Sequence, residues 1–230
     1  LVVAVARTAA SFGASILTKV EATDIHARGV RLHDRVFGTS VDVSASHVIT
    51  ATGVWAEELD PRVHVRPSRG THVVLDAHRL GSPRAALTIP VPGMDARYCF
   101  LLPRPDDTVL AGITDIGVDH IDDVPQAPEE EVTWVLRQVS RVLATELTAA
   151  DVLGTFAGLR PLVSMKAPDD LSDDTTSDVS RKHLVSRSST GSITVTGGKL
   201  TTYRRMAQDA VDMITDRPCR TRSIALVGAQ

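Results

Sequence analysis

The chain has 230 residues, enough for one large domain or two small ones with a buried core. Only 3% of the residues are aromatic and the formal net charge is −3. Both values argue against a nucleic-acid-binding protein, because base stacking needs aromatic side chains and binding to a phosphate backbone normally needs a basic excess. Any anionic ligand must therefore be bound by a few local arginines and lysines.

The two cysteines, Cys99 and Cys219, are far apart in the sequence and indicate neither a disulfide framework nor a metal site. This fits a reducing cytoplasm. No apolar run approaches the length of about 20 residues that spans a bilayer. The chain starts with Leu1 and has no signal-peptide pattern before its first helix. We read both of its ends as cuts in a longer protein.

The first 60 residues combine one helix with short strands. Val2, Val5, Ala6 and Ala9 recur at helical spacing, and Gly13 follows as a stop. Strand-like sequence comes next, in three runs: "GVRLHDRVF" from residue 29, "VDVSAS" from 41, and "HVITATG", a buried strand that ends at residue 53. This order is typical of part of a dinucleotide-binding α/β unit.

The sequence from residue 61 to 150 has a different pattern, rich in prolines and short apolar runs. Prolines separate four strand-like runs, "THVVLD", "ALTIPV", "RYCFLLP" and "TVLAGIT". Antiparallel strands joined by turns fit this pattern best. A helix follows, with Pro128 near its start and three glutamates in its first turn, where the helix dipole favours them. Its apolar stripe runs from Val132 to Leu143, whereas Trp134 lies off the stripe and is expected to face another surface.

The segment from residue 167 to 180 contains five aspartates with serine and threonine between them. Both a solvated loop and an acidic metal site are open, and the loop is the better interpretation. No residue is therefore assigned to a metal.

The most informative stretch is "SITVTGGKLTTYRRMAQDAVDMI", residues 192–214. It predicts a strand, a turn at Gly197 and Gly198, and a helix, with Lys199 at the helix entrance. A helix N-terminus presents unpaired N–H groups, and glycines let a ligand approach the backbone. Such a place suits a phosphate or the pyrimidine edge of a flavin. From spacing alone, an ordinary strand-to-helix turn with a surface lysine is equally open.

The segment "GGKLTTYRRMA" resembles the C-terminal signature of FAD-dependent glycerol-3-phosphate dehydrogenases. The matching residues are Gly197, Gly198, Lys199, Tyr203, Arg204 and Ala207. Five further segments resemble the same family and occur in the family's order: "ATGVWAEEL", "SRGTHVVL", "GITD", "AGLRPLV" and "SRKHLV". In the first of these the family usually has proline where this chain has Val54. The resemblance covers nearly the whole chain.

This resemblance implies an α/β (α+β) fold, in which a partial FAD-binding Rossmann-like domain carries an inserted antiparallel β-rich substrate domain. We expect the FAD-binding part at 1–60, the β-rich domain at 61–150, and a return to the FAD-binding domain with the start of a C-terminal extension at 151–230. The chain departs from the family in one large respect. It contains no Gly-x-Gly-x-x-Gly loop, the motif that binds the FAD pyrophosphate. The family's N-terminal substrate arginine and C-terminal helical domain are also missing.

The resemblance further implies oxidation of sn-glycerol 3-phosphate to dihydroxyacetone phosphate with FAD. Electrons would pass to a quinone, so that the enzyme would be cytoplasmic with a peripheral contact to the inner membrane. Implied catalytic residues are His72, Arg160 and Lys199, and Arg160, Arg181 and Lys199 would bind the phosphate substrate. The implied cofactor-binding residues are Ala22, Thr52, Gly53, Trp55, Gly197, Gly198, Lys199, Leu200 and Thr201.

Several alternatives stay open. "AGLRP" also occurs in amine and amino-acid oxidases of the same superfamily, so Arg160 indicates an anionic substrate without choosing between phosphate and carboxylate. Arg160 could also form a structural ion pair, His72 could be a packed strand histidine, and Trp55 a core residue. Arg181 could be a surface arginine. Oxygen could replace the quinone, and the chain could be a non-catalytic module that binds a partner or a small anion.

Overall fold

The computed structural model describes residues 1–26, 28–94, 97–164 and 183–229. The chain forms two compact units. The first unit comprises Leu1–Thr52, Ala56–Val63 and Arg181–Gln230, and the second unit comprises Gly53–Trp55 and His64–Ser180. The second unit thus extends beyond the domain boundary expected at residue 150, because the strand that follows pairs along its length with the strand that opens the unit.

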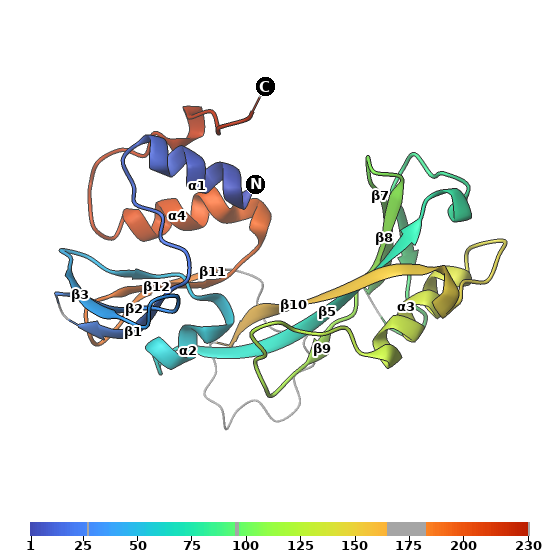
Figure 1. Ribbon diagram of the computed structural model, residues 1–230, viewed down its shortest axis with the longest axis horizontal. Helices are drawn as coiled ribbons and strands as arrows, with labels where there is room; N and C mark the ends of the chain where they lie inside the picture. Colours follow the sequence, from blue (N-terminus) through green and yellow to red (C-terminus); the bar gives the residue numbers. More distant parts are fainter. Residues whose placement is uncertain (27, 95–96, 165–182, 230) are drawn as a thin grey trace. The chain divides into compact units, whose positions relative to one another are not determined.

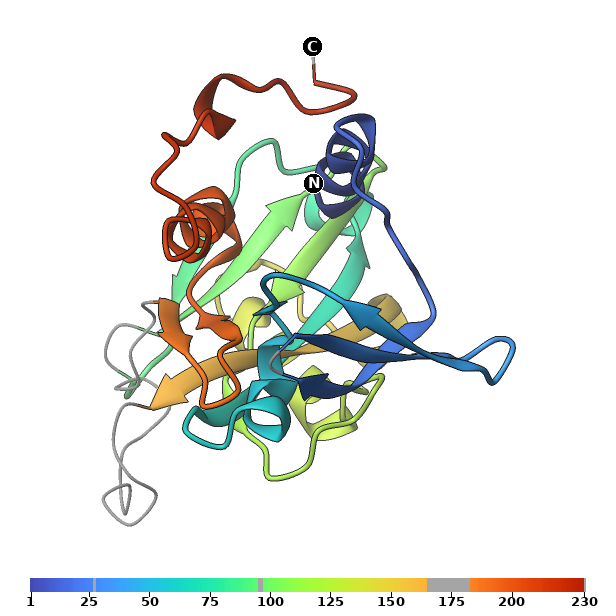
Figure 2. The same cartoon turned by 90° about the vertical axis from the view of Figure 1, so that its left-hand side faces the viewer.

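The first unit begins with helix α1 (Val2–Ser11), in agreement with its helical spacing. Strands β1 (Val20–His26), β2 (Gly29–Asp34) and β3 (Ser40–Ser44) then form an antiparallel sheet in that order, drawn in blue in Figure 2. The strand expected over residues 29–37 ends early, at Asp34. Its carboxylate accepts hydrogen bonds from the backbone N–H groups of Val36 (2.8 Å) and Phe37 (3.1 Å), and this interaction turns the chain.

A second sheet of the first unit has the order β11 (His183–Arg187), β12 (Ile193–Gly197) and β4 (Ile49–Thr50). Strand β12 is antiparallel to β11 and parallel to β4. Helix α4 (Tyr203–Val211) packs on it through Ala210, which lies in one cluster with Ile193 and Val195. The parallel pair is the part of this unit that resembles a dinucleotide-binding fold.

The strand expected to end at Gly53 is shorter than predicted. Only Ile49 and Thr50 belong to β4, and Gly53 opens a 3₁₀ turn, η1 (Gly53–Trp55), before the short helix α2 (Ala56–Leu59). Gly53 has φ +60°, a left-handed conformation that cannot continue a strand.

A buried polar network joins the exit of α2 to β12. Asp60, which is 2% exposed, accepts hydrogen bonds from Thr194 Oγ1 (3.1 Å) and Arg62 Nε (3.1 Å). Thr50 Oγ1 in turn donates to Thr194 Oγ1 (3.0 Å). Burial raises the pKa of Asp60, but the hydrogen bonds from Arg62 and Thr194 outweigh it and leave the pKa below its ordinary value. The charged form of Asp60 thus stabilises this corner of the unit.

The second unit is built on one antiparallel sheet, as its alternating sequence predicts (Figure 1). Its strand order is β10-β5-β8-β7-β6, and β9 pairs with β5. The bounds are β5 His64–Asp76, β6 Leu87–Pro90, β7 Tyr98–Pro103, β8 Thr108–Gly112, β9 Ile116–Gly117 and β10 Val152–Ser164. Strands β5 and β10 have thirteen residues each and are paired over almost their whole length. Val152 pairs with Leu75 at one end, and Ser164 pairs with His64 at the other.

Helix α3 (Glu129–Ser140) starts after Pro128, as predicted, and covers one face of this sheet. Val135, Leu136 and Val139 of its apolar stripe are buried against strand residues of the core. Val142 lies beyond the end of the helix and is 54% exposed. Trp134 packs against the same core, whereas the sequence placed it on another surface. The opposite face of the sheet is left for the site residues described below.

One buried charge ties α3 to the sheet. Glu131 accepts hydrogen bonds from Arg69 Nε (2.7 Å), Thr71 Oγ1 (2.6 Å) and Thr114 Oγ1 (2.6 Å). Burial raises the pKa of Glu131, but the hydrogen bonds from Thr114, Thr71 and Arg69 together bring the pKa below its ordinary value. The carboxylate is therefore ionised in the folded unit at neutral pH.

Within the described ranges, no helix is long and apolar enough to cross a bilayer. In the same part of the chain, no three His, Cys, Asp or Glu side chains gather closely enough to hold a metal ion.

Candidate flavin and substrate sites

The carboxyl ends of β4 and β12 form one edge of the first unit's second sheet, because the two strands are parallel. Thr52 follows β4 at this edge, while Gly197 is the last residue of β12 and Gly198 follows it. Ligands of open α/β sheets bind at the carboxyl ends of parallel strands. The structure thus brings the predicted cofactor residues Thr52, Gly197 and Gly198 to one edge, with Lys199 next in the chain.

The glycine turn has left-handed backbone angles, and a side chain at Gly198 would collide with its neighbours. Gly197 and Gly198 have φ of +72° and +74°, and a Cβ on Gly198 would lie 2.8 Å from Met206 Sδ and 3.0 Å from His183 Cβ. Beyond the turn, the chain enters a 3₁₀ turn, η5 (Leu200–Thr202), and then α4. The backbone carbonyl of Lys199 accepts a hydrogen bond from the Thr202 hydroxyl (2.9 Å).

The side chains of Lys199, Leu200 and Thr201 are exposed. This predicted cofactor group is therefore open to a ligand at the start of a helical segment, where backbone N–H groups favour an anion.

Two buried polar atoms of the described side chains have no hydrogen-bond partner: Thr52 Oγ1 and His72 Nδ1. A buried polar group without a partner costs about 1–3 kcal/mol, so each such atom needs an explanation. Thr52 lies at the strand edge, next to a glycine turn and a lysine. A flavin ring system carries several hydrogen-bond donors and acceptors, so this edge fits the pyrimidine end of a flavin.

His72 lies on β5, on the sheet face opposite α3, since its neighbours Thr71 and Val73 point into the core. Its ring stacks on Phe156 of β10 with centroids 4.7 Å apart and planes 10° apart. Gly112 of β8 lies beneath it, where a Cβ would be 2.8 Å from His72 Cδ2. Burial and then the positive charge of Arg160 lower the pKa of His72. The imidazole is therefore neutral at neutral pH.

Arg160 lies on β10 on the same sheet face. Its guanidinium donates to the carbonyl of Thr114 (3.0 Å) and contacts the carboxylate of Asp115 (3.5 Å). A Cβ on Gly70 would be 2.5 Å from Arg160 Nη2, so the guanidinium crosses β5 over a glycine. Gly70 is two residues before His72, which places the imidazole and the guanidinium next to each other on one open face.

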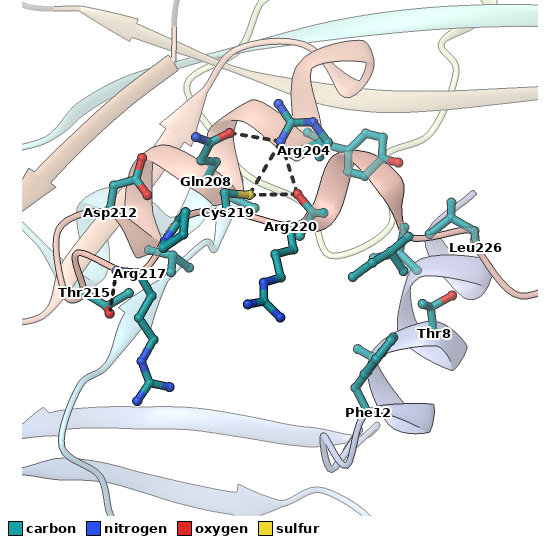
Figure 3. Close-up of a pocket in the computed structure, with 18 residues that line it drawn as sticks. Thr8, Phe12, Arg204, Gln208, Asp212, Thr215, Arg217, Cys219, Arg220 and Leu226 are labelled. Carbon is teal, nitrogen blue, oxygen red and sulfur yellow. Dashed lines mark hydrogen bonds between the residues drawn. The ribbon is translucent and has the colours of Figure 1, made fainter.

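The structure also contains a cavity away from these residues, within the first unit. It has a volume of about 480 Å³ and lies against one side of α4, with α1 and the segment after residue 214 as its other walls (Figure 3). Its lining is mostly apolar, and none of the predicted site residues contributes to it. Cys219 lies in its wall, where hydrogen bonds with Thr221 lower its pKa.

The other predicted residues have varied surroundings. Trp55 is 38% exposed, so it is not the core tryptophan that the sequence left open. Ala22 is exposed on β1, beside an irregularity in the pairing with β2. Gly53 continues the chain from Thr52 into the second unit. Arg181 lies outside the described residues.

The predicted residues are divided between the two units. The first unit holds Ala22, Thr52, Gly197, Gly198, Lys199, Leu200 and Thr201, and the second holds Gly53, Trp55, His72 and Arg160.

Sequence reasoning missed three residues that shape the substrate face: Gly70, Gly112 and Phe156. Glycines inside strands were a usable signal, because such glycines often mark a place where another group approaches the backbone closely. The sequence analysis also gave no role to Asp115, although the matched "GITD" segment ends at this residue.

The sequence profile described as "FAD dependent oxidoreductase" matches residues 1–204. Glycerol-3-phosphate dehydrogenase 1 of Mycobacterium tuberculosis is 47% identical over 236 residues, covering 100% of this chain and 45% of the relative. The crystal structure of glycerol-3-phosphate dehydrogenase from Bacillus halodurans, complexed with FAD, superimposes with a TM-score of 0.81 at 28% identity, over 96% of this chain and 44% of the other.

Glycine oxidase from Bacillus cereus shares the fold, with a TM-score of 0.62 at 20% identity over 90% of this chain and 52% of the other. By the shares of 45% and 44% given above, the chain spans less than half the length of the two glycerol-3-phosphate dehydrogenases.

Proposed function

The chain belongs to the FAD dependent oxidoreductase family, and we propose that the complete protein oxidises sn-glycerol 3-phosphate to dihydroxyacetone phosphate. When bound, FAD supplies the acceptor for the two electrons that leave the secondary carbinol carbon. The substrate assignment is supported by the 47% identity to a glycerol-3-phosphate dehydrogenase over the whole chain. It is also supported by the guanidinium of Arg160 on the sheet face of the second unit.

Arg160 binds the substrate phosphate in this proposal. Its guanidinium donates a hydrogen bond to the carbonyl of Thr114, which fixes its position. The planar fork of an arginine can hold a phosphate with two parallel hydrogen bonds. Arg181, which follows the aspartate-rich segment, is proposed as a second phosphate ligand on the family resemblance alone.

His72 accepts the proton of the substrate hydroxyl. A base must be unprotonated before the reaction, and the lowered pKa of His72 keeps its imidazole neutral at neutral pH. Stacking on Phe156 fixes the plane of the ring. Because the phosphate-binding guanidinium is adjacent, a substrate anchored by its phosphate would present its carbinol group near the imidazole.

The flavin would be held at the edge formed by β4 and β12. Thr52 Oγ1 would gain there the hydrogen bond that it lacks in the protein alone. Gly197 and Gly198 let the backbone approach the ring, and Leu200 and Thr201 follow at the start of the helical segment. Lys199 would stabilise negative charge on the reduced ring or on the substrate oxygen. Gly53, Trp55 and Ala22 are proposed as further contacts on the resemblance.

A quinone is the proposed final electron acceptor, reached by a peripheral contact of a cytoplasmic enzyme with the inner membrane. This proposal rests on the family resemblance, and molecular oxygen is the alternative acceptor. Electron transfer to a soluble quinone analogue, measured against oxygen consumption in the same preparation, distinguishes the two.

The proposal depends on one observation above all: a neutral, partly buried imidazole and a guanidinium lie next to each other on an open sheet face. The test is the oxidation of sn-glycerol 3-phosphate by the complete, FAD-loaded protein with an artificial acceptor, with dihydroxyacetone phosphate measured as product. Glycerol and glycine are the matched comparisons, because glycerol lacks the anion and glycine lacks the carbinol.

Two rival functions can be tested against this proposal. The first is an amino-acid or amine oxidase, an activity that the same fold also carries in glycine oxidase, in which Arg160 would bind a carboxylate. Turnover of an amino acid in preference to glycerol 3-phosphate would establish that rival. A non-catalytic module that binds a small anion is the second rival. A complete protein that binds no FAD would favour it.

A further inference from the structure

Asp115 is the centre of a charged cluster on the second unit. Its carboxylate contacts Arg160 Nη1 at 3.5 Å and Arg97 Nη1 at 3.6 Å, through different oxygens. Arg97 also donates to the backbone carbonyl of Asp115 (3.3 Å). Ser68, fully buried on β5, donates a hydrogen bond to the same carboxylate. One aspartate thus holds two arginines that are 63 positions apart in the sequence.

The three side chains lie at different depths. The side chain of Asp115 is 14% exposed, whereas those of Arg97 and Arg160 are 26% and 30% exposed. The carboxylate therefore lies deeper, and each arginine keeps part of its surface accessible. Among the described side chains of this cluster, two arginines and one aspartate give a net charge of +1.

This charge is suited to a phosphate monoester. Such a group carries about −1.5 to −2 at neutral pH and three acceptor oxygens. A single guanidinium compensates only part of that charge, whereas a second guanidinium on the same carboxylate supplies further positive charge and further N–H donors. A carboxylate substrate, with one charge and two oxygens, needs only one of the two guanidiniums.

We propose that Arg97 is a second anion-binding residue of the substrate site, and that Asp115 is the positioning residue that holds Arg97 beside Arg160. The inference rests on the function proposed above, and it explains how this site would favour a phosphate ester over a carboxylate. It also gives a role to the aspartate of the "GITD" segment.

The test uses the complete, FAD-loaded protein and the variants Arg97→Met, Arg160→Met and the double variant. Arg79→Met is the matched control, since Arg79 forms an ion pair with Asp151 (2.7 Å) in the same unit. Asp151 directly precedes β10 and is nine positions before Arg160 in the sequence. We expect Arg97→Met to raise both the KM for sn-glycerol 3-phosphate and the Ki for inorganic phosphate by at least about tenfold, the loss of one hydrogen bond to a charged group. The control should change neither by more than twofold.

The double variant separates direct binding from an indirect effect. If Arg97 contacts the anion itself, Arg97→Met should raise KM again, by at least about fivefold, in the Arg160→Met background. If Arg97 only supports Asp115 and Arg160, it will have no further effect there, and the proposal is overturned. Should Arg97→Met fail to fold, Arg97→Lys keeps the charge but loses the fork. Its KM and Ki should rise at least about threefold, and unchanged values would overturn the proposal.

A binding readout separates this inference from the proposed function. Inorganic phosphate should raise the thermal unfolding midpoint of the wild-type protein, and less so that of Arg97→Met, whether or not the protein turns over glycerol 3-phosphate. An Arg97-dependent phosphate effect without turnover would reject the proposed function and leave the anion site. Turnover with no Arg97 dependence in KM, Ki or midpoint would reject the anion site alone.

Discussion

Gly70 should control substrate binding although it carries no side chain. Its position on β5 lies under the guanidinium of Arg160, and a Cβ there would be 2.5 Å from Arg160 Nη2 and 2.7 Å from Ile113 Cδ1. Both atoms are the far ends of flexible side chains, so in Gly70→Ala the arginine moves and the strand does not. Its backbone angle is one that alanine can adopt, so the fold should be kept.

The displaced guanidinium loses its place above the strand and with it one hydrogen bond to the substrate phosphate. Such a bond to a charged group is worth about 1.5–3 kcal/mol, which corresponds to a fall in kcat/KM of roughly 10- to 150-fold. The assay is steady-state oxidation of glycerol 3-phosphate by Gly70→Ala, together with its thermal unfolding midpoint.

Gly154→Ala on β10 is the control, because a Cβ at that glycine meets no atom within 4 Å. Kinetics of Gly70→Ala within twofold of wild type would refute the reasoning, as would an equal loss in Gly154→Ala.

The remaining predictions concern other parts of the molecule. Glu131→Gln should lower the free energy of unfolding by roughly 3 kcal/mol at pH 7, because it breaks a buried charge pair. The folded pKa of Glu131 lies below its ordinary value. The stability that the ionised carboxylate contributes is therefore complete above about pH 4.3 and disappears as the pH falls through the folded pKa. Urea unfolding of wild type and Glu131→Gln at pH 7 and pH 3 measures this difference in stability, and a difference that does not change with pH would be contrary evidence. His72→Gln should reduce kcat by about 10²–10⁴-fold, whereas His78→Gln at the surface of the same unit should not. Protonation of His72 should give the wild-type pH profile of kcat/KM an acid limb below about pH 6.5. Arg160→Met removes a neighbouring positive charge, so it should raise the pKa of His72 and move this limb to higher pH. An unmoved limb would argue against His72 as the base. The 230-residue chain purified alone should be colourless, because it lacks a Gly-x-Gly-x-x-Gly loop, and stoichiometric flavin absorbance in that preparation would show the expectation to be wrong.

The parts of the fold that the sequence predicted well are those with local signals. Helix α3 is indicated by Pro128, by the glutamates after it and by its apolar stripe, and the strands of the second unit by alternation between prolines. The strand ending at Gly53 was predicted too long, because apolar composition does not reveal that Gly53 has a positive φ. Local patterns therefore identify an element better than they identify its end.

The candidate site could be predicted only in part, for a related reason. Motifs identified Arg160 and His72 one at a time, but their proximity depends on the register of β10 on β5, in which Phe156 pairs with His72 and Arg160 with Ser68. The contact of Arg97 with Asp115 likewise depends on the folded strands and has no signal in the spacing. A sequence can thus nominate residues, while their cooperation is decided by strand pairing.

The central claim is that Arg160 binds the phosphate of glycerol 3-phosphate. Its most direct test is the kcat/KM of wild type and Arg160→Lys on sn-glycerol 3-phosphate, glycerol and glycine, with an artificial acceptor. Lysine keeps the charge but loses the bidentate fork, so we predict a fall of at least about tenfold on glycerol 3-phosphate and almost no turnover of the other two by wild type. A fall of less than twofold, or glycine as the better substrate, would contradict the account.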